Sequence, residues 1–147
     1  MKEANIQTAF TKNIEEIKGE ILKINNLGSA FELKIEKSKR FTFTNVKDHQ
    51  IANLKNVKNG GCYHKISDSP IFKGMKSRFT AQKPFDCFVL KGNAFVVICW
   101  YEERTRKELH FIDIDDFVKK KEISKMKSMT YEESKEISKI IYNLNKK

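Results

Sequence analysis

Residues 30–61, AFELKIEKSKRFTFTNVKDHQIANLKNVKNGG, contain the pattern that decides the fold. Apolar and polar residues alternate over 30–35, which predicts a strand with one buried face. A basic, irregular stretch follows at 37–44. Beyond it, apolar residues recur at helical spacing and predict a helix that is capped by Thr44 or Asn45.

The segments on either side add helices and strands. Upstream, apolar residues at helical spacing predict one helix over 7–25. Downstream, the period becomes two, which predicts four strands: 62–66, 85–90, 94–101 and 109–114. Residues 91–93, Lys-Gly-Asn, are typical of a hairpin turn and are expected to join the second of these strands to the third.

The C-terminal part of the chain predicts a last helix. Thr130 and Glu133 have the spacing of a capping box, so this helix is expected over about 130–145. Before it, 117–126 is expected to form either a short basic helix or an irregular arm. The whole chain, 1–147, has no linker or repeat, and its order of elements is typical of a single α+β domain.

Composition narrows the range of partners. The chain has 29 Lys and Arg against 19 Asp and Glu, a net charge of +10. Such a surface attracts polyanions, chiefly nucleic acid, although solvated lysines alone would give the same balance. The three cysteines form no CxxC pair, which favours a reducing, cytoplasmic setting. No apolar run approaches the ~20 residues that cross a bilayer, and no signal peptide is expected.

Glu32 and Lys34 are the residues with the clearest chemistry. On a strand they project from the same face, about 7 Å apart along the chain. The carboxylate can hold a divalent metal ion, and the ammonium can lie near an attacking water or a scissile phosphate. Hydrolysis of a phosphodiester uses both. Taken alone, Glu-x-Lys is also what a wet strand of a lysine-rich protein contains, as a surface ion pair.

The wider stretch 31–61 resembles bacterial RecU-type and phage Holliday junction resolvases of the PD-(D/E)XK superfamily. In those proteins an apolar strand with Glu-x-Lys is followed by a Lys/Ser-rich turn, a small-polar stretch and a helix that opens with His-Gln. The matching residues here are Glu32 and Lys34, then 37–39, then Phe43-Thr44, then His49-Gln50. The resemblance implies a restriction-endonuclease-like mixed sheet flanked by helices and cleavage of branched DNA with Mg²⁺, for which Mn²⁺ could substitute. It also implies a homodimer, because such enzymes cut two opposed strands.

The chain departs from this superfamily at the metal-binding Asp. Most members carry it on the strand before Glu-x-Lys, where this chain has Gly28-Ser29-Ala30. Asp86 is the remaining candidate. A rearranged, permutation-like order of the active-site strands would bring its carboxylate within roughly 3 to 6 Å of Glu32, the span that one Mg²⁺ bridges. The alternative is that Asp86 only opens a hairpin strand.

The remaining candidates have weaker signals. Gln50 could hold a water or a metal-bound phosphate, or be an ordinary helix-face residue. Glu20 could complete the metal site or be merely solvated. Asp113 and Asp115 fit a wet strand face better than a second metal site, and the three histidines share no zinc-ligand spacing. The residues that could contact the DNA backbone, or form only a solvated surface, are Lys37, Lys39, Arg40, Lys119, Lys120 and Lys121.

Three functions therefore stay in view. In the first, a resolvase-like endonuclease, Glu32 and Asp86 hold the metal, Lys34 aids the nucleophile and Gln50 contributes. The second is a PD-(D/E)XK nuclease that acts on duplex or single-stranded DNA in phage replication or restriction. The third is a non-catalytic nucleic-acid-binding module. Metal dependence separates the third from the others, and a panel of four-way, flap and linear DNA separates the first two.

Overall fold

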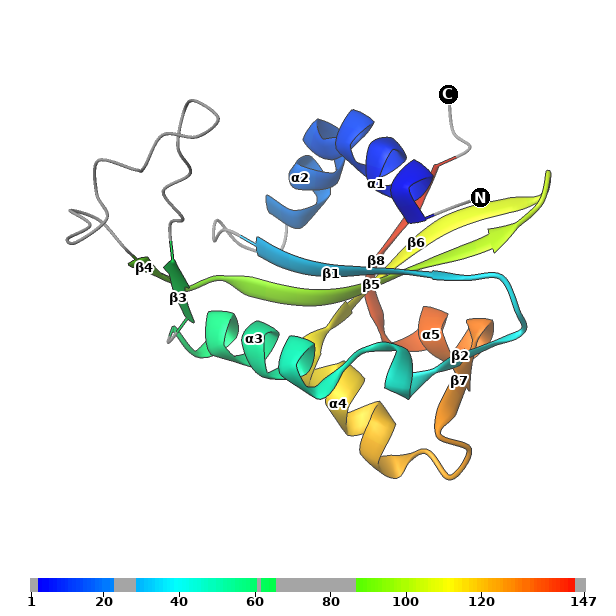
Figure 1. Cartoon of the computed structure of the whole chain (residues 1–147). Coiled ribbons are helices and arrows are strands. Elements are labelled where there is room, and N and C mark those ends of the chain that lie inside the picture. Colours follow the sequence, from blue (N-terminus) through cyan, green and yellow to red (C-terminus); the bar gives the residue numbers. More distant parts are fainter. Residues whose placement is uncertain (1–2, 23–28, 61, 66–86, 145–147) are drawn as a thin grey trace, which may run out of the picture.

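A mixed sheet of four strands forms the centre of the computed structural model, which describes residues 3–22, 29–60, 62–65 and 87–144. In spatial order its strands are β1 (Ser29–Glu36), β5 (Asn93–Glu102), β6 (Arg106–Asp113) and β8 (Ser138–Asn143). β1 and β5 run parallel, and β6 is antiparallel to both of its neighbours. Helices cover both faces of the sheet (Figure 1), so the predicted α+β class with a mixed sheet flanked by helices is confirmed.

Two short helices cover one face, where one long helix was predicted. They are α1 (Glu3–Lys12) and α2 (Ile14–Leu22), and they part at Asn13. The Asn13 amide donates to Ala9 O at 2.8 Å, and its carbonyl oxygen accepts from the Tyr142 hydroxyl at 3.2 Å. Asparagine side chains that bond to nearby backbone compete with the helix in this way.

No helix in the described ranges is long and apolar enough to cross a membrane.

The other face carries α3 (Asp48–Asn59), α4 (Ile114–Ile123) and α5 (Tyr131–Ile137). α3 begins later than predicted, after Lys47, because Phe43 and Val46 are buried and the chain between them forms a 3₁₀ turn, Phe43–Asn45. The helix ends as expected at Gly60, whose φ of 79° is the left-handed conformation that glycine adopts without strain. Just before the turn, β2 (Arg40–Thr42) pairs with β7 (Ser128–Thr130).

The predicted hairpin about 91–93 is wrong. β4 (Cys87–Leu90) pairs with β3 (Cys62–Lys65) in a separate two-stranded sheet, whereas β5 pairs in parallel with β1. The reason lies in β5, whose residues are buried on both sides of the sheet from Ala94 to Trp100. A strand buried on both faces belongs in the middle of a large sheet, with a neighbour on each edge.

The predicted last helix is correct at its start and wrong at its end. The capping box forms, with Glu133 N donating to Thr130 Oγ1 and Thr130 N donating to the Glu133 carboxylate. The helix stops at Ile137, however, and β8 follows. From there Ile140 and Tyr142 pack into the core while Ile141 is 40% exposed, a period of two. Pairing with β8 also covers an edge of β6 that would otherwise have unpaired backbone groups.

A buried polar cluster lies where β5, β6 and α5 meet. His110 Nδ1 is 2.8 Å from Ser134 Oγ, which also accepts from Trp100 Nε1 at 3.0 Å. His110 Nε2 is 3.7 Å from the Glu108 carboxylate. A serine, a histidine and a carboxylate in this order suggest a hydrolase triad, yet Ser134 is 0% exposed and no substrate can reach it. The cluster is therefore structural, and burial lowers the pKa of His110 to about 4.

We expect the protein to lose stability as the pH falls from about 6.5 to about 4. Over this range the unfolded chain protonates at His110 and the folded chain does not, because the pKa is lowered from 6.5 to about 4 only on folding. The contribution of neutral His110 to the free energy of unfolding is complete above pH 6.5, and about 3 kcal/mol is lost as the pH falls through both pKa values. Urea unfolding at several pH values around 5 gives the number of protons taken up on unfolding. This number should be about one lower for His110→Leu than for the wild type.

The exposed His49 on α3 provides the control, since His49→Ala should leave this pH dependence unchanged. A His110→Leu protein whose stability varies with pH as the wild type does would contradict the assignment.

Candidate active site

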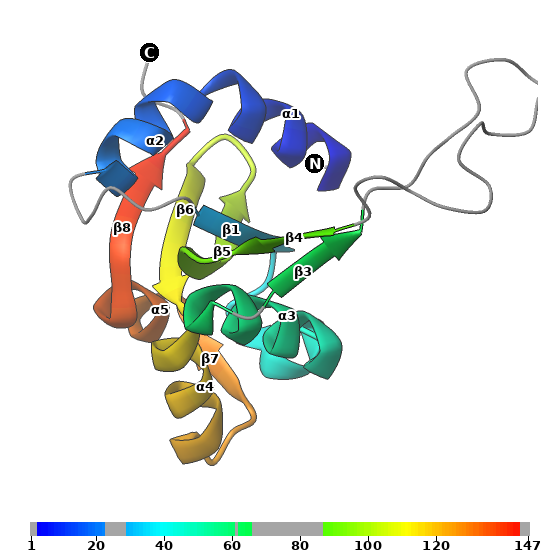
Figure 2. The ribbon, with the colours of Figure 1, turned by 90° about the vertical axis from the view of Figure 1, so that its left-hand side faces the viewer.

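Strand β1 places its side chains alternately on two faces, as its sequence predicts. Phe31, Leu33 and Ile35 pack into the core cluster that also contains Ile17 and Ile21 of α2. Glu32 and Lys34 therefore project from the opposite face, the one on which α3 lies (Figure 2). Because β1 is the terminal strand of the sheet in its described part, this pair of side chains lies at an edge.

Glu32, Lys34 and Gln50 meet on this face. Glu32 Oε1 is 2.8 Å from Lys34 Nζ and accepts a hydrogen bond from Gln50 Nε2 at 2.7 Å. The carboxylate and the ammonium are partly shielded, with 24% and 20% of their side chains exposed. Three of the residues that the sequence singled out are thus in direct contact, although Gln50 is 18 positions from Glu32.

The first turn of α3 fixes the orientation of Gln50. Its Oε1 accepts from Lys47 N at 2.8 Å, so its NH₂ group is directed toward Glu32. Leu54, one turn further along, is buried against the sheet and anchors the helix in this position. The positive end of the helix dipole and the Lys34 ammonium both offset the negative charge of Glu32. The result is a polar site with one preorganised carboxylate.

The donor set fits a divalent ion only in part. In the described part of the chain no three His, Cys, Asp or Glu side chains lie close enough together to hold a metal ion. Mg²⁺ is commonly held by one or two carboxylates together with waters and substrate phosphates, so Glu32 fits the role of a single protein ligand. The prediction for Asp86 falls outside the described residues. β4, which starts one residue later, belongs to the small sheet rather than to that of Glu32.

Glu20 does not join this site. It lies on α2, whose Ile17 and Ile21 are buried against the face of the sheet opposite to Glu32. Figure 2 shows α2 and α3 on opposite sides of the sheet. The proposed metal role of Glu20 beside Glu32 is therefore corrected. The spacing along a helix identified its buried face but could not show which face of the sheet that helix would cover.

The six basic residues predicted to contact DNA fall into two groups. Lys37 and Lys39, in the turn after β1, and Lys119 on α4 are exposed. The other three take part in internal contacts. Arg40 Nε donates to Ser128 Oγ at 2.9 Å, Lys120 Nζ is 2.8 Å from Glu133, and Lys121 Nζ is 3.2 Å from Asp48. The hydrogen bond from Lys120 is the main reason why the pKa of Glu133 is lowered to about 2. The charge of these three side chains is therefore partly taken up by contacts within the chain, whereas that of Lys37, Lys39 and Lys119 is exposed.

Asp113 and Asp115 form an ion cluster that sequence reasoning missed. Lys58 Nζ lies 2.5 Å from a carboxylate oxygen of each, and Asp113 caps α4 by accepting from Asp115 N at 2.9 Å. Burial alone would lower the pKa of Lys58, but the hydrogen bonds to the two carboxylates outweigh it and raise the pKa. Asp113 before a helix is a usual N-cap signal, so the cap at least was recognisable from the sequence.

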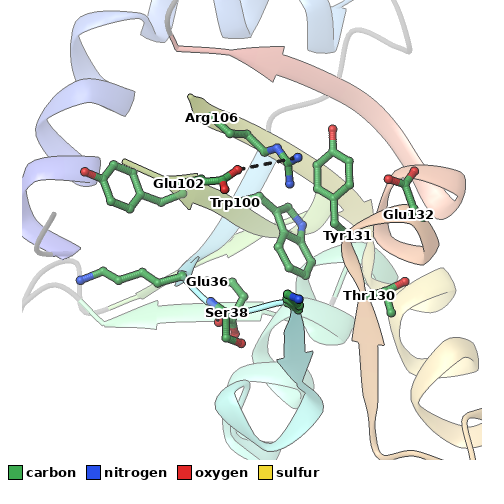
Figure 3. A pocket seen from close by; sticks show the side chains of 11 residues that line it. Glu36, Ser38, Trp100, Glu102, Arg106, Thr130, Tyr131 and Glu132 are labelled. Carbon is green, nitrogen blue, oxygen red and sulfur yellow. Dashed lines mark hydrogen bonds and ion pairs between the residues drawn. The ribbon is translucent and has the colours of Figure 1, made fainter. Parts of the chain in front are cut away.

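A cavity of about 460 Å³ is the second feature of functional interest (Figure 3). Glu36 at the end of β1 and the basic turn 37–39 form one side of it, and Trp100, Arg106 and Tyr131 form another. Sequence reasoning singled out the turn but missed Arg106 and Tyr131. They lie on β6 and α5, and only the folded chain brings them to the turn.

No match to this chain was found among family models, curated proteins or solved structures. The observations that bear on function are therefore the geometry around Glu32 and the positive charge of the chain.

We expect the Glu32–Lys34 pair to contribute little to folding. Partly exposed ion pairs contribute roughly 0.2–1 kcal/mol, and this contribution decreases with added salt. A double-mutant cycle with Glu32→Gln and Lys34→Met, measured by urea unfolding, should give a coupling energy in that range. The matched control is the pair Glu15–Lys18 on α2, with an N–O distance of 2.9 Å and more exposed side chains. A coupling above about 2 kcal/mol would mean that the pair is a structural lock and not a site held ready for a ligand.

Proposed function

We propose that the protein is a divalent-metal-dependent endonuclease that hydrolyses phosphodiester bonds in branched DNA, such as a four-way junction. The observation that supports this proposal is the contact of Glu32 with both Lys34 and Gln50 on β1, the terminal strand of the sheet in its described part. The resemblance of 31–61 to Holliday junction resolvases supplies the substrate class.

Each of the three side chains would have a distinct role. Glu32 would hold Mg²⁺, which supplies Lewis-acid polarisation of the phosphate and lowers the pKa of a bound water. Lys34, 2.8 Å from Glu32, would place its ammonium where negative charge grows on the phosphoryl oxygens. Gln50 is a positioning residue, because its amide is held by Lys47 N and in turn holds the Glu32 carboxylate.

The charge of the chain supports a nucleic-acid substrate. The net charge is +10, and Lys37 and Lys39 are exposed a few residues beyond Lys34 along the same segment. Lys47, at the start of α3, is also exposed. These ammonium groups would neutralise backbone phosphates on either side of the one to be cleaved, which positions DNA without reading its sequence.

A cytoplasmic location and a homodimer complete the proposal. The described free cysteine, Cys99, is buried, and burial raises the pKa of its thiol to about 11, so it remains a packing residue as in proteins of reducing compartments. A two-fold dimer would present two copies of Glu32 to the two opposed strands of a junction.

A non-catalytic DNA-binding module is the second candidate, and one observation favours it. Within the described ranges no group of three metal-ligating side chains occurs, and Glu32 is already paired with Lys34. Such a module would bind DNA through the same positive surface but would not cleave it when Mg²⁺ is added. A nuclease that prefers ordinary duplex or single strands would be revealed by cutting linear DNA as fast as a junction.

We expect Glu32→Gln and Lys34→Met each to reduce Mg²⁺-dependent cleavage of a labelled four-way junction by at least 100-fold, roughly the effect of removing one electrostatic contact from a transition state. Junction affinity, measured in Ca²⁺ or EDTA, should change only a few fold because it is spread over many phosphate contacts.

Glu15→Gln and Lys18→Met are the controls for that experiment, since they remove the same chemical groups from an ion pair on the opposite side of the sheet. Both should cleave at the wild-type rate. Normal cleavage by Glu32→Gln would overturn the site, and absence of cleavage by the wild type on every DNA tested would favour the binding module.

We also expect affinity for DNA to depend steeply on salt. If six or more phosphates are contacted, the association constant should fall by roughly a thousandfold or more between 50 and 200 mM salt. Fluorescence anisotropy with a labelled junction measures this directly. A flat profile would show that the net charge of +10 takes no part in binding, and the nucleic-acid proposal would lose its main physical support.

A further inference from the structure

The cavity at the end of β1 has the size of a small-ligand site. Its volume of about 460 Å³ lies within the roughly 300 to 1,000 Å³ of such sites. Four parts of the chain line it: the end of β1 with the turn after it, the end of β5, the start of β6, and the end of β7 with the start of α5. In Figure 3 the Trp100 ring lies at the centre of the view, with Arg106 and Tyr131 beside it.

One wall consists of two aromatic rings and the Arg106 guanidinium. The Arg106 guanidinium lies 4.0 Å from the centroid of the Tyr131 ring, and the Trp100 ring stands perpendicular to that ring at 5.7 Å. A hydrogen bond fixes the orientation of each ring: the Tyr131 hydroxyl donates to Glu108 at 2.6 Å, and Trp100 Nε1 donates to Ser134 Oγ. Arg106 remains 38% exposed. A planar guanidinium that is supported by an aromatic ring is a surface on which nucleobases stack.

The polar groups around the cavity favour a base over an anion. Three carboxylates line it, Glu36, Glu102 and Glu132, and so do three cations, Lys37, Lys39 and Arg106. An anion inside would meet as much repulsion as attraction. A nucleobase is neutral, and its amino groups can donate to carboxylates. The two lysines lie in the exposed turn, where they can reach backbone phosphates instead.

That turn is also held in shape. Ser38 N donates to the Glu36 carboxylate at 2.7 Å, and Ser38 Oγ donates to Arg40 O at 2.9 Å. These bonds close the turn upon itself, so a nucleotide that enters does not have to order it. The cost in conformational entropy on binding is correspondingly small.

The cavity and the candidate active site share one strand. Glu36 lines the cavity, and Glu32 lies four residues earlier on the same face of β1, about 13 Å away along the strand. This distance corresponds to about four nucleotide steps at the 3.4 Å rise of one DNA strand. A single DNA molecule could therefore occupy both places.

We propose that this cavity binds one unpaired nucleotide of DNA, whose base stacks on the Arg106 guanidinium while Lys37 and Lys39 contact the adjoining phosphates. The inference rests on the proposed function and deepens it. A base in a continuous duplex is paired and stacked and can enter only after it is extruded, which costs a few kcal/mol. The cavity thus gives a physical reason for a preference for branched or partly single-stranded DNA over intact duplex.

Binding of three oligonucleotides without divalent metal tests this, because no cleavage then interferes. They are a duplex with one bulged 2-aminopurine nucleotide, the same duplex with an abasic residue at the bulge, and the fully paired duplex. Stacking of one base contributes 1–3 kcal/mol, so the wild type should bind the bulged base roughly tenfold more tightly than either of the others and quench its fluorescence. Arg106→Ala should lose this preference.

Two further variants separate stacking from charge. Arg106→Lys keeps the charge without the planar group and should also lose most of the preference. Arg104→Ala and Arg104→Lys, at an exposed position in the turn between β5 and β6, should keep it. Equal affinity of the wild type for the bulged base and the abasic bulge, or an unchanged preference in Arg106→Ala, would overturn the inference while leaving the nuclease proposal intact. Failure to bind any of the three, together with failure to bind a four-way junction, would overturn the nuclease proposal as well.

Discussion

The parallel pairing of β1 with β5 is the interaction on which the rest of the structure depends. Its register sets Glu32 opposite Val96 and Lys34 opposite Ile98. β5 is buried on both faces of the sheet. The register of β1 against it decides which side chains of β1 face the core under α1 and α2 and which lie on the face shared with α3. A slip of one residue would exchange the two faces and bury the Glu32 carboxylate among Ile17, Ile21 and their neighbours. The candidate site exists because that register is fixed.

Local patterns predicted the local structure well. The alternation around Glu32, the end of α3 at Gly60 and the capping box at Thr130 depend on residues close together in sequence, and each forms as predicted. The errors concern long-range pairing. Residues 138–143 satisfy both a helical and a two-residue period, and the open edge of β6 decides between them. In the same way, β4 pairs with β3 and not with β5, because β5 already pairs with β1 and β6.

The same distinction applies to the site. Glu32, Lys34 and Gln50 could be predicted together because they belong to one continuous strand–turn–helix stretch, in which Gln50 is 18 positions from Glu32. Glu20 could not be placed, since the face of the sheet that its helix covers is not encoded locally. The contacts of Arg40 with Ser128 and of Lys120 with Glu133 could not be predicted either, because they join residues that are 88 and 13 positions apart. The stacked Arg106 and Tyr131 likewise come from separate elements, and neither has a signal in its own neighbourhood.

The location of a bound divalent ion is the most direct test of the central claim, that Glu32 is a metal ligand flanked by Lys34 and Gln50. The experiment is a crystal structure of the Lys34→Met protein with a junction oligonucleotide and Mn²⁺, in which anomalous scattering identifies the ion. We predict a peak about 2.1 Å from a Glu32 carboxylate oxygen and in contact with a DNA phosphate. Well-ordered DNA and Glu32 with no anomalous peak at that carboxylate would contradict the account.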